Sequence, residues 1–217
     1  MLSFELTPQR GQGHKILCLG AHADDIEIGC GGTIRKLMER YKRCEIFWVV
    51  FSAEGPRRRE AMKSARRILE GAAKKKVVVK NFRGSFFPFE GRRIKESFEQ
   101  LKKQFQPDVI FTHCRGDLHQ DHRTVCEFTW NTFRSHLIFE YEIPKYDGDL
   151  GAPNLFSPLD RAACERKVEH LLKAFPSQRV RPWFEKETFF SLMRLRGVEC
   201  NSPSGYAEAF YCRKSVL

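Results

Sequence analysis

The sequence predicts an α/β protein built on one open, mostly parallel sheet with helices on both faces. Two observations support this fold class. Apolar runs of strand length alternate with amphipathic, helix-like stretches between residues 14 and 143, which is the pattern of a parallel sheet connected by helices. Two groups of histidines and aspartates each follow such an apolar run directly. Because ligands bind beyond the carboxyl ends of the strands in sheets of this kind, we expect both groups at one edge of the sheet.

The expected elements alternate along the first two thirds of the chain. Strands are expected where a short apolar or alternating run occurs, at residues 14–21, 45–51, 77–82, 107–113 and 136–143. Helices are expected where apolar residues recur at spacings of three and four, at residues 33–41, 57–69, 94–105 and from Asp121 or Thr124 to Phe133. The stretch from Gly29 to Gly32 predicts a tight turn before the first of these helices.

After Pro144 the pattern changes. Residues 147–154 are rich in turn-forming residues, which predicts a loop over the site. Asp160 is well placed to cap a helix. The elements expected in this part are helices at 160–175 and 183–196 and a final strand at 206–212.

The size and composition are those of one globular domain. The chain has 217 residues, of which 41% are hydrophobic and 30% charged, and neither a repeat nor a linker interrupts it. We therefore expect a single domain over residues 1–217, in which residues 144–217 form a C-terminal extension that packs on the rest and shapes the substrate site. No apolar run is long enough to span a membrane. Residues 1–13 lack the basic and apolar regions of a secretory signal, so we expect a cytoplasmic location.

The eight cysteines are scattered singly and form no C-x-x-C pair. Several lie in apolar runs, where a free cysteine behaves as a small hydrophobic residue. For a chain without a secretory signal, this distribution predicts reduced thiols rather than a disulfide framework.

The net charge of +11 is compatible with nucleic acid, an anionic membrane surface or an anionic small substrate as partner. Most of the excess is spread over the expected helices, with denser groups at residues 57–59 and 74–76. No recognition-helix pattern or aromatic RNA-binding motif accompanies these groups. The pattern therefore favours solvated helix faces over nucleic-acid binding.

The two groups of histidines and aspartates together form a candidate metal site. The first is Ala21-His22-Ala23-Asp24-Asp25-Ile26-Glu27, and the second is Asp117-Leu118-His119-Gln120-Asp121-His122-Arg123. His22 and Asp25 can converge on one ion, and His122 would complete a set of two histidines and one carboxylate. Mixed nitrogen and oxygen ligands favour Zn²⁺ or Fe²⁺ over Ca²⁺ or Mg²⁺, and an incomplete ligand set is typical of a catalytic site.

The remaining polar residues of the two groups have candidate roles in proton transfer. A catalytic metal lowers the pKa of its bound water to about 7, and Asp24 is the candidate general base for that water. His119 is placed to stabilise an oxyanion or to protonate a leaving amine. Asp121 would hold the His119 ring in one tautomer. Either group alone is also compatible with a helix cap or an incidental pattern, but the two together, each after a parallel strand, favour a metal-dependent hydrolase.

The other histidines have simpler interpretations. We expect His14, His136 and His170 to be structural or exposed. His113 ends the expected strand at 107–113, so we expect it beside the metal ligands rather than among them.

The two motifs resemble those of a known enzyme family. AHADDIEIGCGG is similar to the A-H-P-D-D-x-E…G-G signature of the LmbE-like, or PIG-L, N-deacetylases, and DLHQDHR is similar to their second motif, D-x-H-x-D-H. The resemblance covers roughly residues 15–143. It implies a Rossmann-like fold and a divalent metal, generally zinc, that serves to remove acetyl groups from N-acetylglucosamine-containing substrates. Ala23 stands where the family usually has proline, and Glu27 comes one position later than in many members.

Residue by residue, the resemblance implies the same three metal ligands and Asp24 as general base. His119 would be the electrophilic residue or general acid, with Asp121 as its partner. The resemblance adds a substrate-binding arginine, because Arg57-Arg58-Arg59-Glu60 matches a family Arg-x-x-Glu segment whose arginine contacts the sugar. Arg57 is the matching position, and a neighbouring arginine is the alternative.

The expected function is zinc-dependent hydrolysis of a linear amide bond, removing the N-acetyl group from an N-acetylglucosamine-type sugar or conjugate. The basic composition suits a small substrate that carries phosphate or carboxylate. One alternative is an amidase that cleaves another C–N bond in a thiol conjugate or glycoconjugate. A second is a nucleotide- or nucleic-acid-binding module, although Gly29 to Gly32 lacks a full G-x-G-x-x-G. Monomer and oligomer are both compatible with the sequence.

Overall fold

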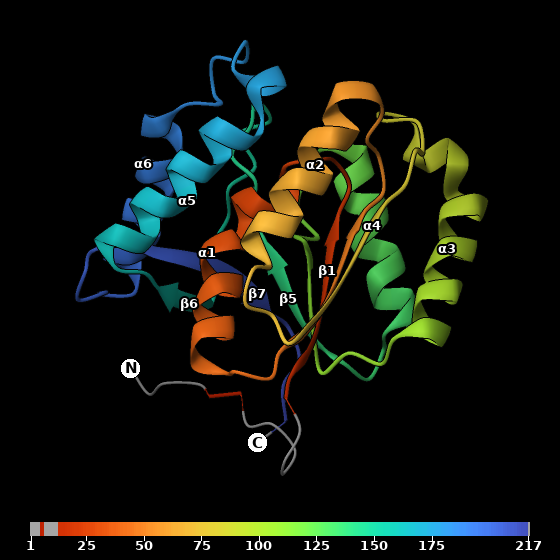
Figure 1. Cartoon of the computed structure of the whole chain (residues 1–217), viewed down its shortest axis with the longest axis horizontal. Helices are drawn as coiled ribbons and strands as arrows, with labels where there is room; N and C mark the ends of the chain where they lie inside the picture. Colours follow the sequence, from red (N-terminus) through yellow and green to blue (C-terminus); the bar gives the residue numbers. More distant parts are fainter. Residues whose placement is uncertain (1–4, 7–12, 217) are drawn as a thin grey trace.

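The fold is a mixed sheet of seven strands with helices on both faces (Figure 1), and the computed structural model describes residues 5–6 and 13–216. The strand order is β3-β2-β1-β4-β5-β7-β6. The strands are β1 (Lys15–Gly20), β2 (Glu45–Val50), β3 (Lys74–Val79), β4 (Val109–His113), β5 (Leu137–Tyr141), β6 (Leu155–Pro158) and β7 (Ala207–Cys212). Strands β1 to β5 pair in parallel, and β7 runs antiparallel to both β5 and β6. The prediction of an open, mostly parallel sheet is confirmed.

Six α-helices among the described residues cover the two faces of this sheet (Figure 1). They are α1 (Asp25–Arg40), α2 (Gly55–Ile68), α3 (Gly91–Gln104), α4 (Gln120–Thr132), α5 (Arg161–Ala174) and α6 (Lys186–Glu199), with two short 3-10 helices, η1 (Phe87–Glu90) and η2 (Pro176–Gln178). Side chains alternate along β1, so that Ile16 and Cys18 join the core under α1, α2, α5 and α6, whereas Leu17 and Leu19 join the core under α3 and α4. The apolar runs of the sequence are thus strands buried on both sides.

The tight turn expected from Gly29 to Gly32 is wrong, because these residues lie inside α1. A Cβ atom at Gly29 would lie 2.2 Å from Cδ2 of Tyr141 on β5, and one at Gly32 would lie 2.6 Å from Cδ1 of Leu159. The glycines therefore allow α1 to pack closely on β5 and on the segment after β6. Their role is packing and not chain reversal.

Two strands differ from the expectation. Strand β3 begins at Lys74 rather than at Val77, so three exposed lysines lie within an edge strand. Lysine is a residue that commonly protects a sheet edge from pairing with another chain. The four-residue strand β6 was not expected and pairs with β7 at the opposite edge.

The segment after Pro144 shares the sheet and the core with the rest of the chain. It contributes β6, β7, α5 and α6, and Asp160 caps α5 as expected, its carboxylate accepting a hydrogen bond from the backbone N–H of Ala163. On β7, buried Glu208 accepts hydrogen bonds from the backbone N–H groups of Gly32 and Thr33 in α1. All eight cysteines are free thiols, and seven of them are buried.

Within the described part of the chain, no helix is long and apolar enough to cross a membrane. The expectation about a secretory signal concerns residues 1–13, of which all but 5, 6 and 13 lie outside the described residues.

Candidate metal centre

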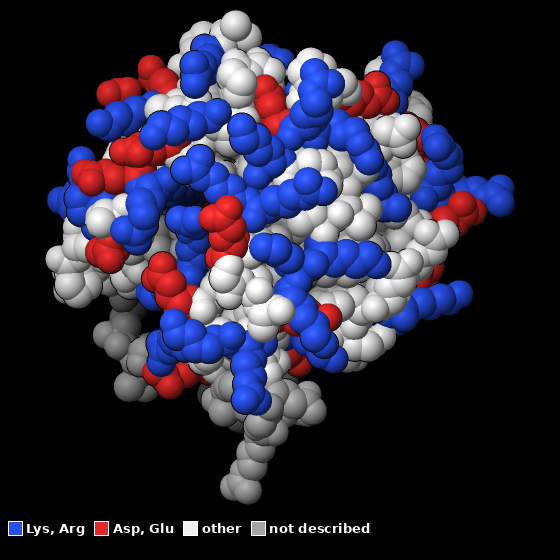
Figure 2. Space-filling model, in the orientation of Figure 1, with Lys and Arg blue, Asp and Glu red and all other residues white. Residues whose placement is uncertain are grey.

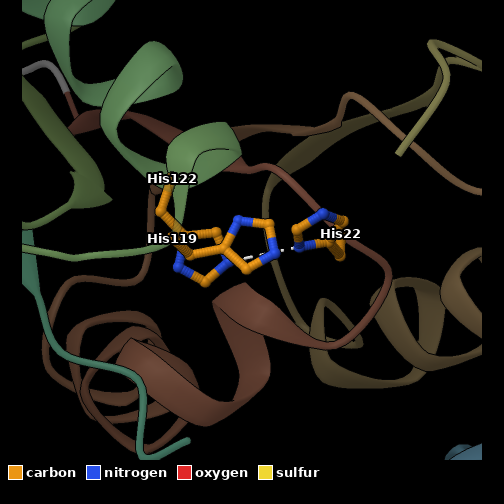
Figure 3. Close-up of side chains that lie close together, drawn as sticks. All are labelled: His22, His119 and His122. Atoms are coloured by element: carbon orange, nitrogen blue, oxygen red, sulfur yellow. Dashed lines mark hydrogen bonds between the residues drawn. The ribbon is translucent and has the colours of Figure 1, made fainter. Parts of the chain in front are cut away.

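The two motifs meet beyond the carboxyl ends of β1 and β4. These strands are neighbours and pair in parallel, so the loops that follow them leave the sheet at the same edge. His22 lies between β1 and α1, and Asp25 is the first residue of α1. His119 is the N-cap of α4, and His122 lies in its first turn. Figure 3 shows the three histidine rings of the two motifs gathered in one place.

Three donor atoms from His22, Asp25 and His122 form a nearly regular triangle. His22 Nδ1 lies 3.1 Å from His122 Nε2 and 3.5 Å from Asp25 Oδ2, and the third side, from His122 Nε2 to Asp25 Oδ2, is 3.6 Å. Ligand atoms about 2.1 Å from a tetrahedral ion lie about 3.4 Å from one another. The spacing of the three atoms therefore fits a divalent ion such as zinc.

The other nitrogen of each histidine faces a carboxylate. His122 Nδ1 lies 2.8 Å from Asp117 Oδ2, and His22 Nε2 lies 3.0 Å from Asp121 Oδ2. When these nitrogens carry protons and donate to the carboxylates, the two facing nitrogens are both bare acceptors. Two lone pairs 3.1 Å apart repel each other unless a cation or a proton lies between them, so this arrangement favours a bound cation. The carboxylate behind each ring is the usual support of a metal-binding histidine.

The protonation of the metal-free site agrees with this picture. Burial lowers the pKa of His22, but the carboxylates of Asp25 and Asp121 outweigh it and raise that pKa to about 10. Burial, together with the neighbouring His113, lowers the pKa of His122 to about 3. Without a metal, a proton on His22 therefore takes the place of the cation between the two rings.

His119 lies over both candidate ligand rings on the more open side of the site. Its ring packs edge-on against His22 at 4.9 Å and stacks on His122 at 4.6 Å between centroids. The backbone N–H of Asp121 donates to His119 Nδ1, so in the neutral ring the proton is on Nε2. Burial and the charge of His22 lower the pKa of His119. The result is a neutral imidazole whose Nε2–H group has no hydrogen-bond partner among the residues that the structure describes.

Asp24 lies next to Asp25 but has different partners. Its side chain is buried, and its Oδ1 accepts a hydrogen bond of 3.0 Å from Arg57 at the start of α2. Burial raises the pKa of Asp24, and the Arg57 guanidinium offsets this in part. The structure thus brings Arg57 to the site, where it contacts the predicted base directly.

The carboxylate of Asp121 does not contact the ring of His119, which was its expected partner. It accepts hydrogen bonds from the backbone N–H groups of Ser85 and Phe87 and faces His22, while its link to His119 runs through its own backbone N–H. Asp121 is therefore placed to hold a candidate metal ligand, and the carboxylate does not hold the ring of His119. A local pattern could not reveal this, because the other partners come from a loop about 35 residues earlier.

The sequence interpretation assigned no role to Asp117, Lys145 or Asp149. Besides facing His122, Asp117 forms a 3.1 Å ion pair with Lys145, whose side chain is 8% exposed. Lys145 also pairs with Asp149, and Asp149 accepts a hydrogen bond from the backbone N–H of Leu118. The turn-rich segment after β5 thus reaches the second motif. Asp117 could have been found as the first residue of that motif, but no local signal marks the other two.

His113, the last residue of β4, lies next to the candidate ligands. It is fully buried, its Nε2 lies 3.1 Å from Asp25 Oδ2, and its ring stacks on His122 at 3.9 Å. Among the described residues, His113, Asp25 and His122 form one group of possible metal ligands, and His22, His119 and His122 form another. Both groups share His122, so they describe one site.

The fold and the site define an α/β protein with a histidine–carboxylate centre at the carboxyl edge of a parallel sheet. The sequence identifies the family: the chain belongs to the PIG-L family, whose model, described as GlcNAc-PI de-N-acetylase, matches residues 17–133, more than half of the chain. The resemblance inferred from the two motifs is confirmed.

Solved structures of three other proteins share this fold. The N,N'-diacetylchitobiose deacetylase from Pyrococcus horikoshii matches with a TM-score of 0.70 and 22% identity over 91% of this chain and 83% of that chain. The 4-carboxy-2-hydroxymuconate hydratase from Pseudomonas putida KT2440 matches with a TM-score of 0.72 and 16% identity over 94% and 98%. A teicoplanin deacetylase matches with a TM-score of 0.70 and 12% identity over 91% and 97%. At these identities the likeness concerns the fold.

Proposed function

We propose that the protein is a zinc-dependent deacetylase that removes the N-acetyl group from an amino sugar or an amino-sugar conjugate. The observation that carries this proposal is the triangle of His22, Asp25 and His122 donor atoms with the buried Asp24 carboxylate beside it. Membership in the PIG-L family supports it, and two of the proteins with the same fold are deacetylases by name.

His22, Asp25 and His122 would hold the ion. A divalent metal supplies Lewis-acid activation of water and of the amide carbonyl when it is bound in such a set. Zinc suits two nitrogen ligands and one oxygen ligand, and Fe²⁺ is the next candidate on the same chemistry. Asp117 would orient His122 through its Nδ1 atom, and Asp121 would orient His22 through its Nε2 atom.

Asp24 would act as the general base. A carboxylate that is to accept a proton from water at neutral pH works best when its pKa is higher than usual, and burial provides this shift for Asp24. Arg57 holds one oxygen of this carboxylate. Its Nε–H group is buried without a hydrogen-bond partner among the described residues, but the side chain as a whole is 35% exposed, so its outer N–H groups would bind a hydroxyl or anionic group of the substrate.

His119 would act at the carbonyl oxygen. Its Nδ1 is occupied by the backbone N–H of Asp121, which leaves the Nε2–H group to donate a hydrogen bond to an oxyanion. The proton that Asp24 takes from water would pass to the departing nitrogen, so the amine would leave and the tetrahedral carbon would collapse to acetate.

The decisive experiment measures acetate released from a panel that includes N-acetylglucosamine, N,N'-diacetylchitobiose and phosphate-bearing N-acetylglucosamine conjugates. We expect acetate from at least one member with the wild type and none with His122→Ala. Because the same fold is found in a hydratase, each substrate is also examined for other products. Release of a larger acid would support the amidase alternative, and no acetate from any member of the panel would contradict the proposal.

A further inference from the structure

A cavity lies between α1, α2 and α5, apart from the histidines of the candidate metal centre. It has a volume of about 160 Å³, and none of the three candidate metal ligands lines it. Figure 2 shows Lys and Arg side chains gathered around a hollow on this face of the molecule. We call it the α1–α5 cavity, and the residues that matter for its chemistry are Glu27, Arg35, Lys36, Ile68, Leu159 and Arg166.

The floor of the cavity contains an unused hydrogen-bonding atom. Glu27 is 1% exposed, and its Oε1 accepts a hydrogen bond from Ser64. Its Oε2 has no hydrogen-bond partner among the described residues. A buried polar atom without a partner is costly and uncommon, so this oxygen indicates a missing partner, such as a ligand hydroxyl, which can both donate and accept.

The walls of the cavity supply cations that are little used by the protein. Among the described residues, the Arg166 guanidinium has no ion pair or hydrogen bond, and Arg35 has only one hydrogen bond, of 3.5 Å, to the carbonyl oxygen of Arg67. Lys36 donates one hydrogen bond to the carbonyl oxygen of Pro158 and keeps two donors. Guanidinium groups on two facing helices are well suited to hold a phosphate.

Other charged groups also border the cavity. Lys167 forms an ion pair with buried Glu208. Asp160 caps α5 by accepting a hydrogen bond from the backbone N–H of Ala163. Glu39 is exposed at the rim. Burial and the positive charges of Arg35 and Arg67 lower the pKa of the neighbouring His170 to about 4, which is consistent with a positive potential on this side of the cavity.

We propose that the α1–α5 cavity binds a small hydroxylated phosphate monoester. The phosphate lies between Arg35 and Arg166 with Lys36 beside it, and a hydroxyl group of the ligand forms a hydrogen bond with Glu27 Oε2. Three cations match the double charge of a phosphate monoester better than the single charge of a carboxylate. Ile68 and Leu159 line the space between, and a cavity of this volume holds a ligand of about benzene size.

Calorimetric titration of the full chain with glycerol 3-phosphate tests this proposal. We expect saturable binding at one site, weaker binding of inorganic phosphate, which cannot reach Glu27 at the same time, and none of glycerol. Arg166→Ala and Arg35→Ala should each weaken binding at least tenfold. Arg92→Ala removes an exposed arginine on α3 and serves as the charge-matched control, so it should bind like the wild type.

A further variant distinguishes the two sites, because a phosphate ester could also bind near the histidines. His122→Ala should bind glycerol 3-phosphate like the wild type when the ligand occupies the α1–α5 cavity. The proposal is overturned by absence of saturable binding, by undiminished binding in both Arg166→Ala and Arg35→Ala, or by loss of binding in His122→Ala. Circular dichroism of each variant checks that the fold is intact.

Discussion

The two halves of the candidate metal centre are held in different ways. The first half, His22 and Asp25, belongs to the connection between β1 and α1, and the backbone N–H of His22 donates a 2.6 Å hydrogen bond to Asp25 Oδ2. The second half, with His119 and His122, depends on the ion pairs that Lys145 forms with Asp117 and Asp149. The turn that carries His22 and Asp25 is therefore organised by its own local chain, although Asp121 of the second motif faces the His22 ring, whereas Asp117 behind His122 is held by a segment some 30 residues later.

This difference explains which parts of the site follow from the sequence. A local arrangement leaves a compact motif, and a support that comes from far along the chain leaves none. The comparison also predicts that variants in the two halves will fail differently.

Asp24→Asn should have the largest effect on turnover. The amide keeps the shape of the side chain but cannot accept the proton, so kcat should fall by about 10²–10⁴-fold, while zinc affinity should stay near the wild-type value because Asp24 is not one of the three ligands. Steady-state acetate release and zinc titration measure the two quantities. Glu70→Gln, at an exposed position just after α2, is the control. Unchanged kcat would remove Asp24 from the mechanism.

Asp117→Asn should weaken zinc binding by about 10–100-fold, the usual effect of losing the carboxylate behind a metal-binding histidine. The reason is that the His122 ring loses the acceptor that fixes its Nδ1 proton. Turnover at saturating zinc should recover in large part, unlike that of Asp24→Asn. Zinc affinity equal to the wild type would show that the second half does not need this support.

Zinc binding should release about one proton near pH 7. In the metal-free site the pKa of His22 is raised to about 10, so His22 is protonated below that pH and must lose its proton before it can bind the metal. Zinc affinity should consequently rise up to about tenfold for each pH unit through the neutral range, and the rise should end as the pH passes about 10. Calorimetry in two buffers of different ionisation enthalpy counts the protons, and binding without release would contradict the assigned protonation.

Lys145→Met should have the smallest effect, a loss of zinc affinity of about tenfold or less. Its charge holds Asp117 and Asp149 and therefore acts on His122 only indirectly. Lys145→Arg should restore much of the affinity, and Lys42→Met, at an exposed position before β2, should have no effect. An equal loss of zinc affinity in Lys42→Met and Lys145→Met would show that the effect comes from the net charge of the protein and not from the ion pairs of Lys145.

Much of the fold could be predicted because buried strands and amphipathic helices leave regular local patterns. The exceptions depended on distant partners. The glycines from Gly29 to Gly32 read as a turn, since Tyr141 and Leu159, which leave no room for a Cβ at Gly29 and Gly32 respectively, lie more than a hundred residues later. Three lysines concealed the start of β3, whose exposed edge tolerates them. Strand β6 is only four residues long and is defined by its pairing with β7.

The candidate site divides in the same way. His22, Asp25 and His122 could be grouped from the sequence because each follows a parallel strand, and the structure places their donor atoms within 3.6 Å of one another. The partner of the Asp121 carboxylate was assigned incorrectly, because His22 and the loop before η1 reach it through space. Lys145 and Asp149 lie outside both motifs.

Zinc stoichiometry and affinity, measured side by side on the wild type, Asp25→Ala and His122→Ala, test the central claim most directly. The claim is that residues of both motifs, His22 and Asp25 from the first and His122 from the second, hold the same ion. We predict one zinc per chain in the wild type and a large loss of affinity in each variant, although the two substitutions lie on different halves of the site. Full zinc occupancy with wild-type affinity in both variants would contradict it.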